Sequence, residues 1–110
     1  MDSYRDFTFD KADDRYNGLP EFATNLKKKN MQYIPILDAG VALRPKGNYD
    51  AYTQGKESDI YVKIKEGEDL IANVWPKDSV FPDFFNDKTM TWWSDQLTAF
   101  SKVLPFSGLW

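Results

Sequence analysis

Apolar residues recur at helical spacing near the start of the chain. The first set follows Gly18 at spacings of three, four and seven: Leu19, Phe22, Ala23 and Leu26. Pro20 suits the first turn of a helix, and the lysines at 27–29 suit its last turn, where carbonyl groups are left unpaired. The pattern predicts a helix from Leu19, with these four side chains on its core face and Asn30 closing it in a left-handed conformation.

A second helix is predicted after Asn86, because this residue type caps helix N-termini well. Its apolar stripe has spacings of four, seven and eleven: Trp93, Leu97, Phe100 and Leu104. Trp92 lies beside this stripe and is expected to pack against a neighbouring element. Pro105 ends the helix.

Two nearly continuous apolar segments predict strands. Residues 32–38 read Gln-Tyr-Ile-Pro-Ile-Leu-Asp without regular polar alternation, as in a parallel strand that is buried on both faces. Pro35 is unusual in such a strand because it cannot donate a ladder hydrogen bond. Residues 106–110 are predicted to begin a second strand of the same kind.

The middle of the chain carries a different pattern. Residues 39–58 are predicted to form a long loop, since three glycines, a proline and charged residues interrupt them. From Asp59 onward apolar and polar residues alternate, and the turn-forming residues 66–69 separate this run from residues 70–75. This arrangement predicts a β-hairpin.

The order of these elements indicates the fold class. Helix, buried strand, inserted hairpin, helix and second strand follow the logic of an α/β protein with a parallel sheet. Two helices cannot cover both faces of such a sheet and leave its edges open. Residues 1–110 are therefore expected to be a slice through one larger α/β domain.

Composition removes several classes of function. The 110 residues include no Cys and no His, which excludes Cys/His zinc sites, cysteine nucleophiles and Ser-His-Asp triads within them. The net charge is −3 and the basic run at 27–29 is short, so nucleic acid is not an expected partner. No apolar run approaches the roughly 20 residues of a membrane span. Aromatic residues make up 16% of the chain, which favours either a dense core or a surface that stacks on flat ligands.

Candidate chemistry lies at the ends of the extended segments, where α/β proteins bind ligands. Asp38 ends the first of them, and a ligand contact and a simple turn-forming role are equally open for it. Trp75 and Trp110 also end extended runs. An indole there can cover the apolar face of a sugar ring or pack in a core.

Six ordered blocks of the sequence resemble glycoside hydrolase family 31, in particular its lysosomal, intestinal and plant α-glucosidases. The blocks are RDFTFD at 5–10, GLP at 18–20, ILD at 36–38, VWP at 74–76 with FPDF at 81–84, WW at 92–93 and PFSGLW at 105–110. The resemblance covers essentially the whole chain. It implies an α/β fold that is a partial (β/α)8 TIM barrel, roughly from after strand 2 to the start of strand 4, with an inserted β-hairpin.

The resemblance also implies a substrate-binding site. Ile36 and Trp110 would be apolar surfaces around the glucose in the first subsite, Asp38 a polar contact, and Trp75 an indole at the tip of the hairpin excursion. In the family, the block ending at Trp110 is followed by Ile-Asp-Met-Asn-Glu, whose Asp is the catalytic nucleophile. The resemblance therefore implies no catalytic residue, metal or cofactor within residues 1–110.

The implied activity is retaining hydrolysis of α-linked glucosides or oligosaccharides by a full-length protein. Residues 1–110 alone are expected to be inactive and to need the rest of the barrel. Two other interpretations stay open: a non-catalytic carbohydrate-binding module that kept the aromatic walls, and a gene fragment without independent function. No compartment is predicted.

Overall fold

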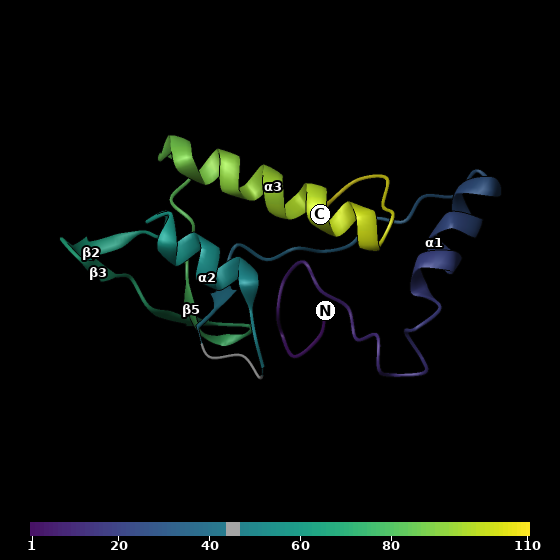
Figure 1. The fold of residues 1–110 in the computed structure, drawn as a ribbon, viewed down its shortest axis with the longest axis horizontal. Coiled ribbons are helices and arrows are strands. Elements are labelled where there is room, and N and C mark those ends of the chain that lie inside the picture. Colours follow the sequence, from purple (N-terminus) through teal and green to yellow (C-terminus); the bar gives the residue numbers. More distant parts are fainter. Residues whose placement is uncertain (44–46) are drawn as a thin grey trace.

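The helices and strands of the chain are arranged along one long axis. The computed structural model describes residues 1–43 and 47–110, and the molecule extends over 50 × 28 × 20 Å. The helices are α1 (Leu19–Lys28), α2 (Asp50–Glu57) and α3 (Asp87–Val103). The strands are β1 (Val41–Ala42), β2 (Lys63–Lys65), β3 (Glu68–Asp69), β4 (Ala72–Val74) and β5 (Lys77–Val80). In Figure 1, α3 runs along one side of the molecule, α1 stands at one end and the β2–β3 pair at the other.

Helix α1 begins and ends as its sequence predicts. Leu19 is its first residue, and Asn30 follows it in the left-handed region with φ = 57°. Ala23 is buried and Leu19 packs beside it. The prediction that Phe22 faces the core is wrong, because its side chain is exposed. A short helix at the end of the molecule has too few neighbours to cover its whole apolar stripe.

Helix α3 also follows its sequence signals. The Asn86 side chain accepts a hydrogen bond from the backbone N–H of Lys88 at 3.0 Å, which caps the helix. Phe100 and Leu104 are buried. Trp92 packs against a neighbouring element as expected, and its indole N–H donates to the Ala51 carbonyl of α2 at 3.1 Å.

The prediction of a long loop over 39–58 is wrong, because α2 lies within it. Gly55 is required in α2, since a Cβ atom there would overlap the hydroxyl oxygen of Tyr61. That hydroxyl donates to the Tyr52 carbonyl at 3.1 Å. Because Gly55 has no side chain, the Tyr61 ring can pack against α2 and form this bond. Residues 44–46 of the predicted loop lie outside the described residues.

The strands pair differently from the single predicted hairpin. β2 pairs antiparallel with β3, around a turn in which Gly67 has φ = 76°. Residues 72–74 do not return to β2; as β4 they pair antiparallel with β5, and β5 pairs with β1. The 70–75 segment therefore belongs to a second hairpin, with Trp75 in its turn.

Residues 33–37 run beside residues 107–110 without forming a regular strand. The backbone N–H groups of Ser107 and Trp110 donate to the carbonyls of Tyr33 and Pro35, at 2.9 and 3.0 Å. The N–H of Leu37 donates to the Trp110 carbonyl at 2.8 Å. Both segments advance together along these bonds, which is the parallel sense expected of them. We call these two segments the parallel pair.

The prediction that the parallel pair is buried on both faces is wrong for this chain. The side chains of Ile34, Ile36, Leu109 and Trp110 are all exposed. Parallel strands are normally covered on both faces, and the part of the chain that the structure describes covers only part of this pair.

Two hydrophobic clusters hold the fold together. The larger lies between the β1–β5 strands, α2 and α3, and contains Val41, Ala42, Tyr49, Ala51, Ile60, Tyr61, Val80 and Trp92. The smaller joins α1 to the C-terminal half of α3 and contains Phe9, Ala23, Phe100 and Leu104. Phe7 touches both, since its ring meets those of Trp92, Trp93 and Phe100 edge to face.

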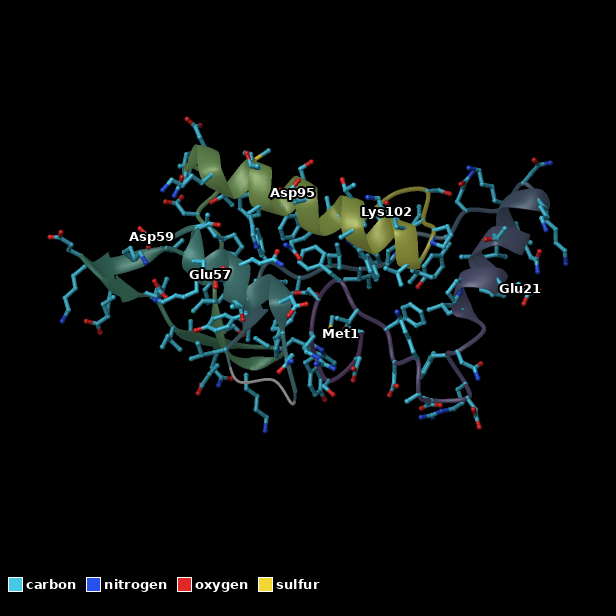
Figure 2. All side chains as sticks on the ribbon, viewed as in Figure 1. Met1, Glu21, Glu57, Asp59, Asp95 and Lys102 are labelled. Atoms are coloured by element: carbon cyan, nitrogen blue, oxygen red, sulfur yellow. The ribbon has the colours of Figure 1, made fainter. Side chains whose placement is uncertain are left out.

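The described residues form no closed barrel. Their named strands pair only antiparallel, in a three-stranded and a two-stranded sheet. No helix among the described residues is both long and apolar enough to cross a membrane. Charged side chains such as Glu21, Glu57, Asp95 and Lys102 lie on the outside of the molecule (Figure 2).

Candidate functional site

The parallel pair brings Ile36 and Trp110 together. The Trp110 N–H and carbonyl bond to Pro35 and Leu37, on either side of Ile36, so the two residues lie opposite each other. Opposed residues of paired strands project from the same face. Ile36 is 61% exposed and Trp110 is 80% exposed, which leaves an aliphatic and an indole surface open beside each other.

Asp38 lies two positions after Ile36, where the chain turns. Its Oδ1 atom accepts a hydrogen bond from the backbone N–H of Gly40 at 2.9 Å, so the carboxylate has a fixed orientation. A Cβ atom at Gly40 would lie 2.7 Å from Cγ2 of Val74, which shows how closely the turn packs on the β4–β5 hairpin. Asp38 therefore does what both open interpretations require: it forms a turn and stays half-exposed.

Trp75 occupies the turn of the β4–β5 hairpin, next to Val74, and is 71% exposed. Its indole meets the ring of Tyr4 at 5.8 Å between centroids, with the planes 70° apart. Val74, which precedes Trp75, lies close to Gly40, which comes two residues after Asp38. The turn that carries Trp75 and the turn that carries Asp38 therefore belong to neighbouring parts of the structure. The rings of Trp75 and Trp110 do not pair with each other in the part of the chain that the structure describes.

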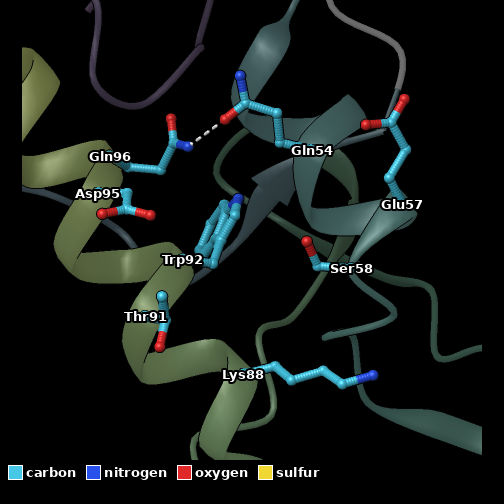
Figure 3. Close-up of a pocket in the computed structure, with 8 residues that line it drawn as sticks. All are labelled: Gln54, Glu57, Ser58, Lys88, Thr91, Trp92, Asp95 and Gln96. Atoms are coloured by element: carbon cyan, nitrogen blue, oxygen red, sulfur yellow. Dashed lines mark hydrogen bonds between the residues drawn. The ribbon is translucent and has the colours of Figure 1, made fainter.

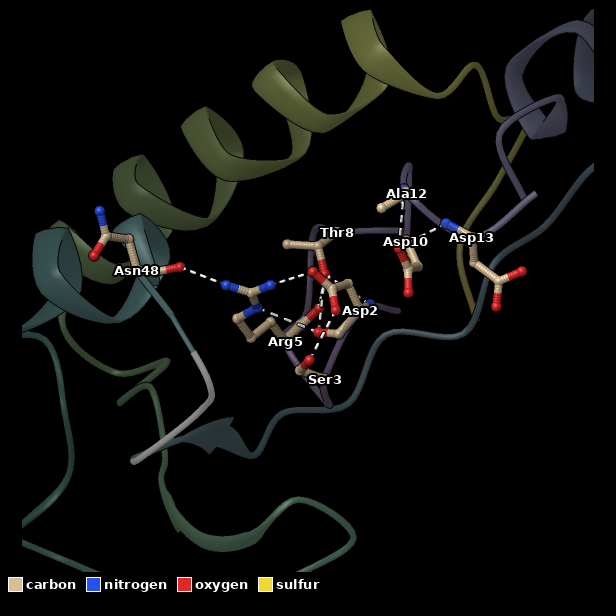
Figure 4. A network of polar contacts seen from close by, with 8 residues as sticks. All are labelled: Asp2, Ser3, Arg5, Thr8, Asp10, Ala12, Asp13 and Asn48. Atoms are coloured by element: carbon tan, nitrogen blue, oxygen red, sulfur yellow. Dashed lines mark hydrogen bonds and ion pairs between the residues drawn. The ribbon is translucent and has the colours of Figure 1, made fainter. Parts of the chain in front are cut away.

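The N-terminal loop that carries Tyr4 is held by a polar network (Figure 4). Arg5 forms an ion pair with Asp2 and donates from Nη1 to the Asn48 carbonyl at 2.7 Å, just before α2. Thr8 accepts from the Asp2 N–H at 3.0 Å and donates to the Arg5 carbonyl at 2.5 Å. These bonds fix the loop between residues 2 and 8 against the start of α2.

Asp6 lies in the same loop and was not among the predicted site residues. It is 1% exposed, and neither carboxylate oxygen has a hydrogen-bond partner among the described residues. Burial is the main cause that raises the pKa of Asp6 to about 7; the charge of Asp38 acts in the same direction, and the Asp38 backbone opposes the shift. Asp6 stands in the RDFTFD block, but no spacing rule assigns chemistry to a single acid there.

The Tyr49 hydroxyl is a second buried polar group without a hydrogen-bond partner in the described part of the chain. Burial raises its pKa, and the charge of Asp6 adds to the shift. Asp6 and Tyr49 also line one hollow of about 430 Å³ that opens between the N-terminal loop, α2 and α3. Two groups that normally need hydrogen-bond partners thus line the same hollow.

Another hollow lies between α2 and α3, away from these residues (Figure 3). It has a volume of about 550 Å³, and Gln96 donates to Gln54 across it at 2.7 Å. None of the four predicted site residues lines it. Trp92, at its floor, is buried and already bonded to Ala51, so this hollow is a furrow between two packed helices.

No group of three or more acidic side chains suited to a metal ion occurs in residues 1–43 and 47–110. The site consists instead of two apolar surfaces, one oriented carboxylate and one exposed indole. Such surfaces can hold a sugar ring by its apolar face and by a hydroxyl group. Acid–base chemistry would need further carboxylates.

Comparison with known proteins identifies related sequences. The family profile described as "Glycosyl hydrolases family 31 TIM-barrel domain" matches residues 1–110. All of the chain aligns with lysosomal alpha-glucosidase of Bos taurus at 37% identity and with intestinal sucrase-isomaltase of Rattus norvegicus at 36%. It also aligns over its whole length with alpha-xylosidase 1 of Arabidopsis thaliana at 34%.

The same arrangement of elements occurs in solved structures. The glucosidase II alpha subunit in its Glc1Man2-bound form superposes on the whole chain with a TM-score of 0.83 at 23% identity. The chain spans 12% of that structure, 12% of the bovine and Arabidopsis proteins and 6% of the rat protein. It therefore corresponds to a small part of each relative.

Proposed function

The chain belongs to glycosyl hydrolase family 31, as a part of its TIM-barrel domain, and from this premise we propose that residues 1–110 form part of the sugar-binding wall of a retaining α-glucosidase. One observation carries the proposal: Ile36 and Trp110 lie opposite each other and exposed, two residues from the oriented carboxylate of Asp38.

The proposed wall acts on the substrate without performing the bond cleavage. Ile36 and Trp110 cover the apolar faces of the bound sugar and exclude water, and Asp38 accepts hydrogen bonds from its hydroxyl groups. Trp75 closes the site from the β4–β5 hairpin. The nucleophile and the acid/base, which a retaining glycosidase places about 5–5.5 Å apart, come from other parts of the complete barrel.

The substrate class follows from the relatives. Of the relatives named above, one is a lysosomal alpha-glucosidase, one is an intestinal sucrase-isomaltase and one is an alpha-xylosidase. We therefore propose α-linked glucosides as substrates, with α-xylosides as the competing class.

A graft tests the proposal. Residues 1–110 would replace the aligned segment of the bovine lysosomal alpha-glucosidase, which matches over 111 residues. We expect this protein, called the graft below, to hydrolyse a chromogenic α-glucoside faster than the matching α-xyloside, and the isolated chain to hydrolyse neither. A graft that folds but is inactive would contradict the proposal and favour a fragment without function. Sugar binding by the isolated chain would favour the carbohydrate-binding module.

A further inference from the structure

Trp75 stands on a turn that gives its indole little support. The strand before it, β4, is exposed throughout, and the Trp75 side chain itself is 71% exposed. Exposed side chains change rotamer within nanoseconds, so an indole that closes a binding site needs a neighbour that limits its orientation. Among the described residues, the Trp75 ring pairs with one other aromatic ring, that of Tyr4.

Tyr4 meets the indole in a favourable geometry. The ring centroids are 5.8 Å apart and the planes are inclined by 70°, so that the edge of one ring points to the face of the other. Aromatic pairs prefer this arrangement, because the ring edge is positive and the face is negative. Tyr4 is 51% exposed, and neither ring belongs to the two hydrophobic clusters. The pair therefore orients the indole from outside the core that stabilises the fold.

The backbone of Tyr4 is held in an unusual conformation. Ser3 and Tyr4 have φ values of 50° and 60°, in the left-handed region that residues with a side chain rarely adopt. Such a conformation persists only where the surrounding structure holds it. The Arg5 N–H donates to the Asp2 carbonyl at 2.9 Å, and the Arg5 guanidinium bonds the Asp2 carboxylate and the Asn48 carbonyl (Figure 4). The loop thus presents the Tyr4 ring from a base that is fixed to the segment leading into α2.

We propose that Tyr4 is a positioning residue whose ring fixes the Trp75 indole over the bound sugar. This inference rests on the proposed function, in which Trp75 closes the sugar site. Without the Tyr4 ring, the indole must lose more rotational freedom when substrate binds, and binding weakens accordingly. The proposed nucleophile and acid/base lie outside residues 1–110, so kcat should change little.

The experiment measures KM and kcat for a chromogenic α-glucoside in the graft and its variants. Tyr4→Ala should raise KM roughly three- to tenfold, the strength of one aromatic pair, with kcat and the melting temperature nearly unchanged. Tyr4→Phe keeps the ring and should retain the KM of the graft; a KM as high as that of Tyr4→Ala would overturn the role of the ring. Tyr16→Ala is the matched control and should behave like the graft, since Tyr16 is similarly exposed, at 47%, and its ring lies near Arg15.

A double-mutant cycle shows whether Tyr4 acts through Trp75. If Trp75→Ala leaves KM unchanged, the assignment of Trp75 to the sugar site is wrong, and the inference fails with it. If Trp75→Ala raises KM, Tyr4→Ala should add nothing further in that background. A rise of the same size in both backgrounds, or no rise in the graft, overturns the role of Tyr4 alone.

A second variant decides if Tyr4→Ala fails to fold. Tyr4→Leu keeps an apolar side chain and removes the aromatic ring. A raised KM with an unchanged kcat supports the inference, and an unchanged KM overturns it.

Discussion

The β1–β5 pair and the parallel pair carry equally apolar side chains, but their surroundings are opposite. In the β1–β5 pair, Val41 and Val80 lie opposite each other and have no exposed surface, because α2 and α3 cover them. In the parallel pair, Ile36 and Trp110 lie opposite each other and are mostly exposed. An apolar sequence pattern therefore predicts that a side chain is buried in the complete protein, but not whether a helix, another strand or a ligand buries it.

Trp92, which packs in the cluster over the β1–β5 pair, and Trp110, in the parallel pair, differ most in exposure and give the largest expected effects. Trp92→Ala in the graft should lower the free energy of unfolding by about 3–5 kcal/mol, because a buried indole and its bond to Ala51 are lost. Trp110→Ala should change stability little and reduce kcat/KM by at least roughly 10- to 200-fold, the range for losing a single methylene contact in an apolar substrate pocket. Thermal unfolding and steady-state kinetics measure the two effects.

The reverse result would remove the distinction between the regions. If Trp110→Ala destabilised the graft as much as Trp92→Ala, with kcat/KM reduced only in proportion to the folded fraction, Trp110 would be a core residue. Phenylalanine at either position serves as the matched control, since it keeps a ring and removes only the indole N–H and part of the surface.

Gly40 lies where the two regions meet, and its substitution should have an intermediate effect. In Gly40→Ala the new Cβ would meet Cγ2 of Val74 at 2.7 Å, so the 38–40 turn or the β4–β5 hairpin must move. We expect a loss of about 1–3 kcal/mol in stability and a higher KM, because Asp38 moves with the turn. Gly18→Ala is the control, since no atom lies near a Cβ there. A graft with Gly40→Ala and an unchanged KM would separate the turn from substrate binding.

The smallest expected effect concerns the ion pairs of Asp69, which join β3 to α2 and β2. Asp69 of β3 bonds Lys56 of α2 at 2.5 Å and also pairs with Lys63. Burial opposes ionisation, but the two ammonium groups outweigh it and lower the pKa of Asp69. Asp69→Asn should cost about 0.5–1 kcal/mol at neutral pH, as for partly exposed pairs.

The sign of the pH dependence checks that assignment. A lowered carboxyl pKa stabilises the folded protein above the unfolded-state value, and the contribution is lost as the pH falls through the lowered value. The difference in melting temperature between the graft and Asp69→Asn should therefore shrink on acidification. A difference that grows in acid would show that the ion pairs do not act through the Asp69 charge.

The sequence predicted those elements whose signals are local. The bounds of α1 and α3 depend on Pro20 and Asn86 and on apolar spacing within each helix, and both helices were placed correctly. The parallel sense of the two extended segments was also predicted. The four site residues stay a prediction in their sugar-binding role, although the structure joins Ile36 to Trp110 and links Asp38 to the hairpin of Trp75.

The errors concern features that only tertiary contacts define. Helix α2 has a weak local pattern, and it is held by Tyr61 over Gly55 and by the bond from Trp92, neither of which can be read from residues 50–57. The register of the hairpins depends on β1, which pairs with β5 from a distant part of the sequence. Asp6 was missed because burial without a partner becomes visible only in three dimensions.

The bond between the Trp110 amide and the Pro35 carbonyl joins positions 75 residues apart (110 minus 35). The entropic cost of closing a flexible loop grows with its length, so this pair is expensive to form while the chain between its ends is disordered. Formation of α2, both hairpins and α3 shortens the effective loop. We therefore expect the order of folding to run from the antiparallel sheet to the parallel pair, so that the face proposed to bind a sugar is completed last and only on a chain whose remaining structure is already in place.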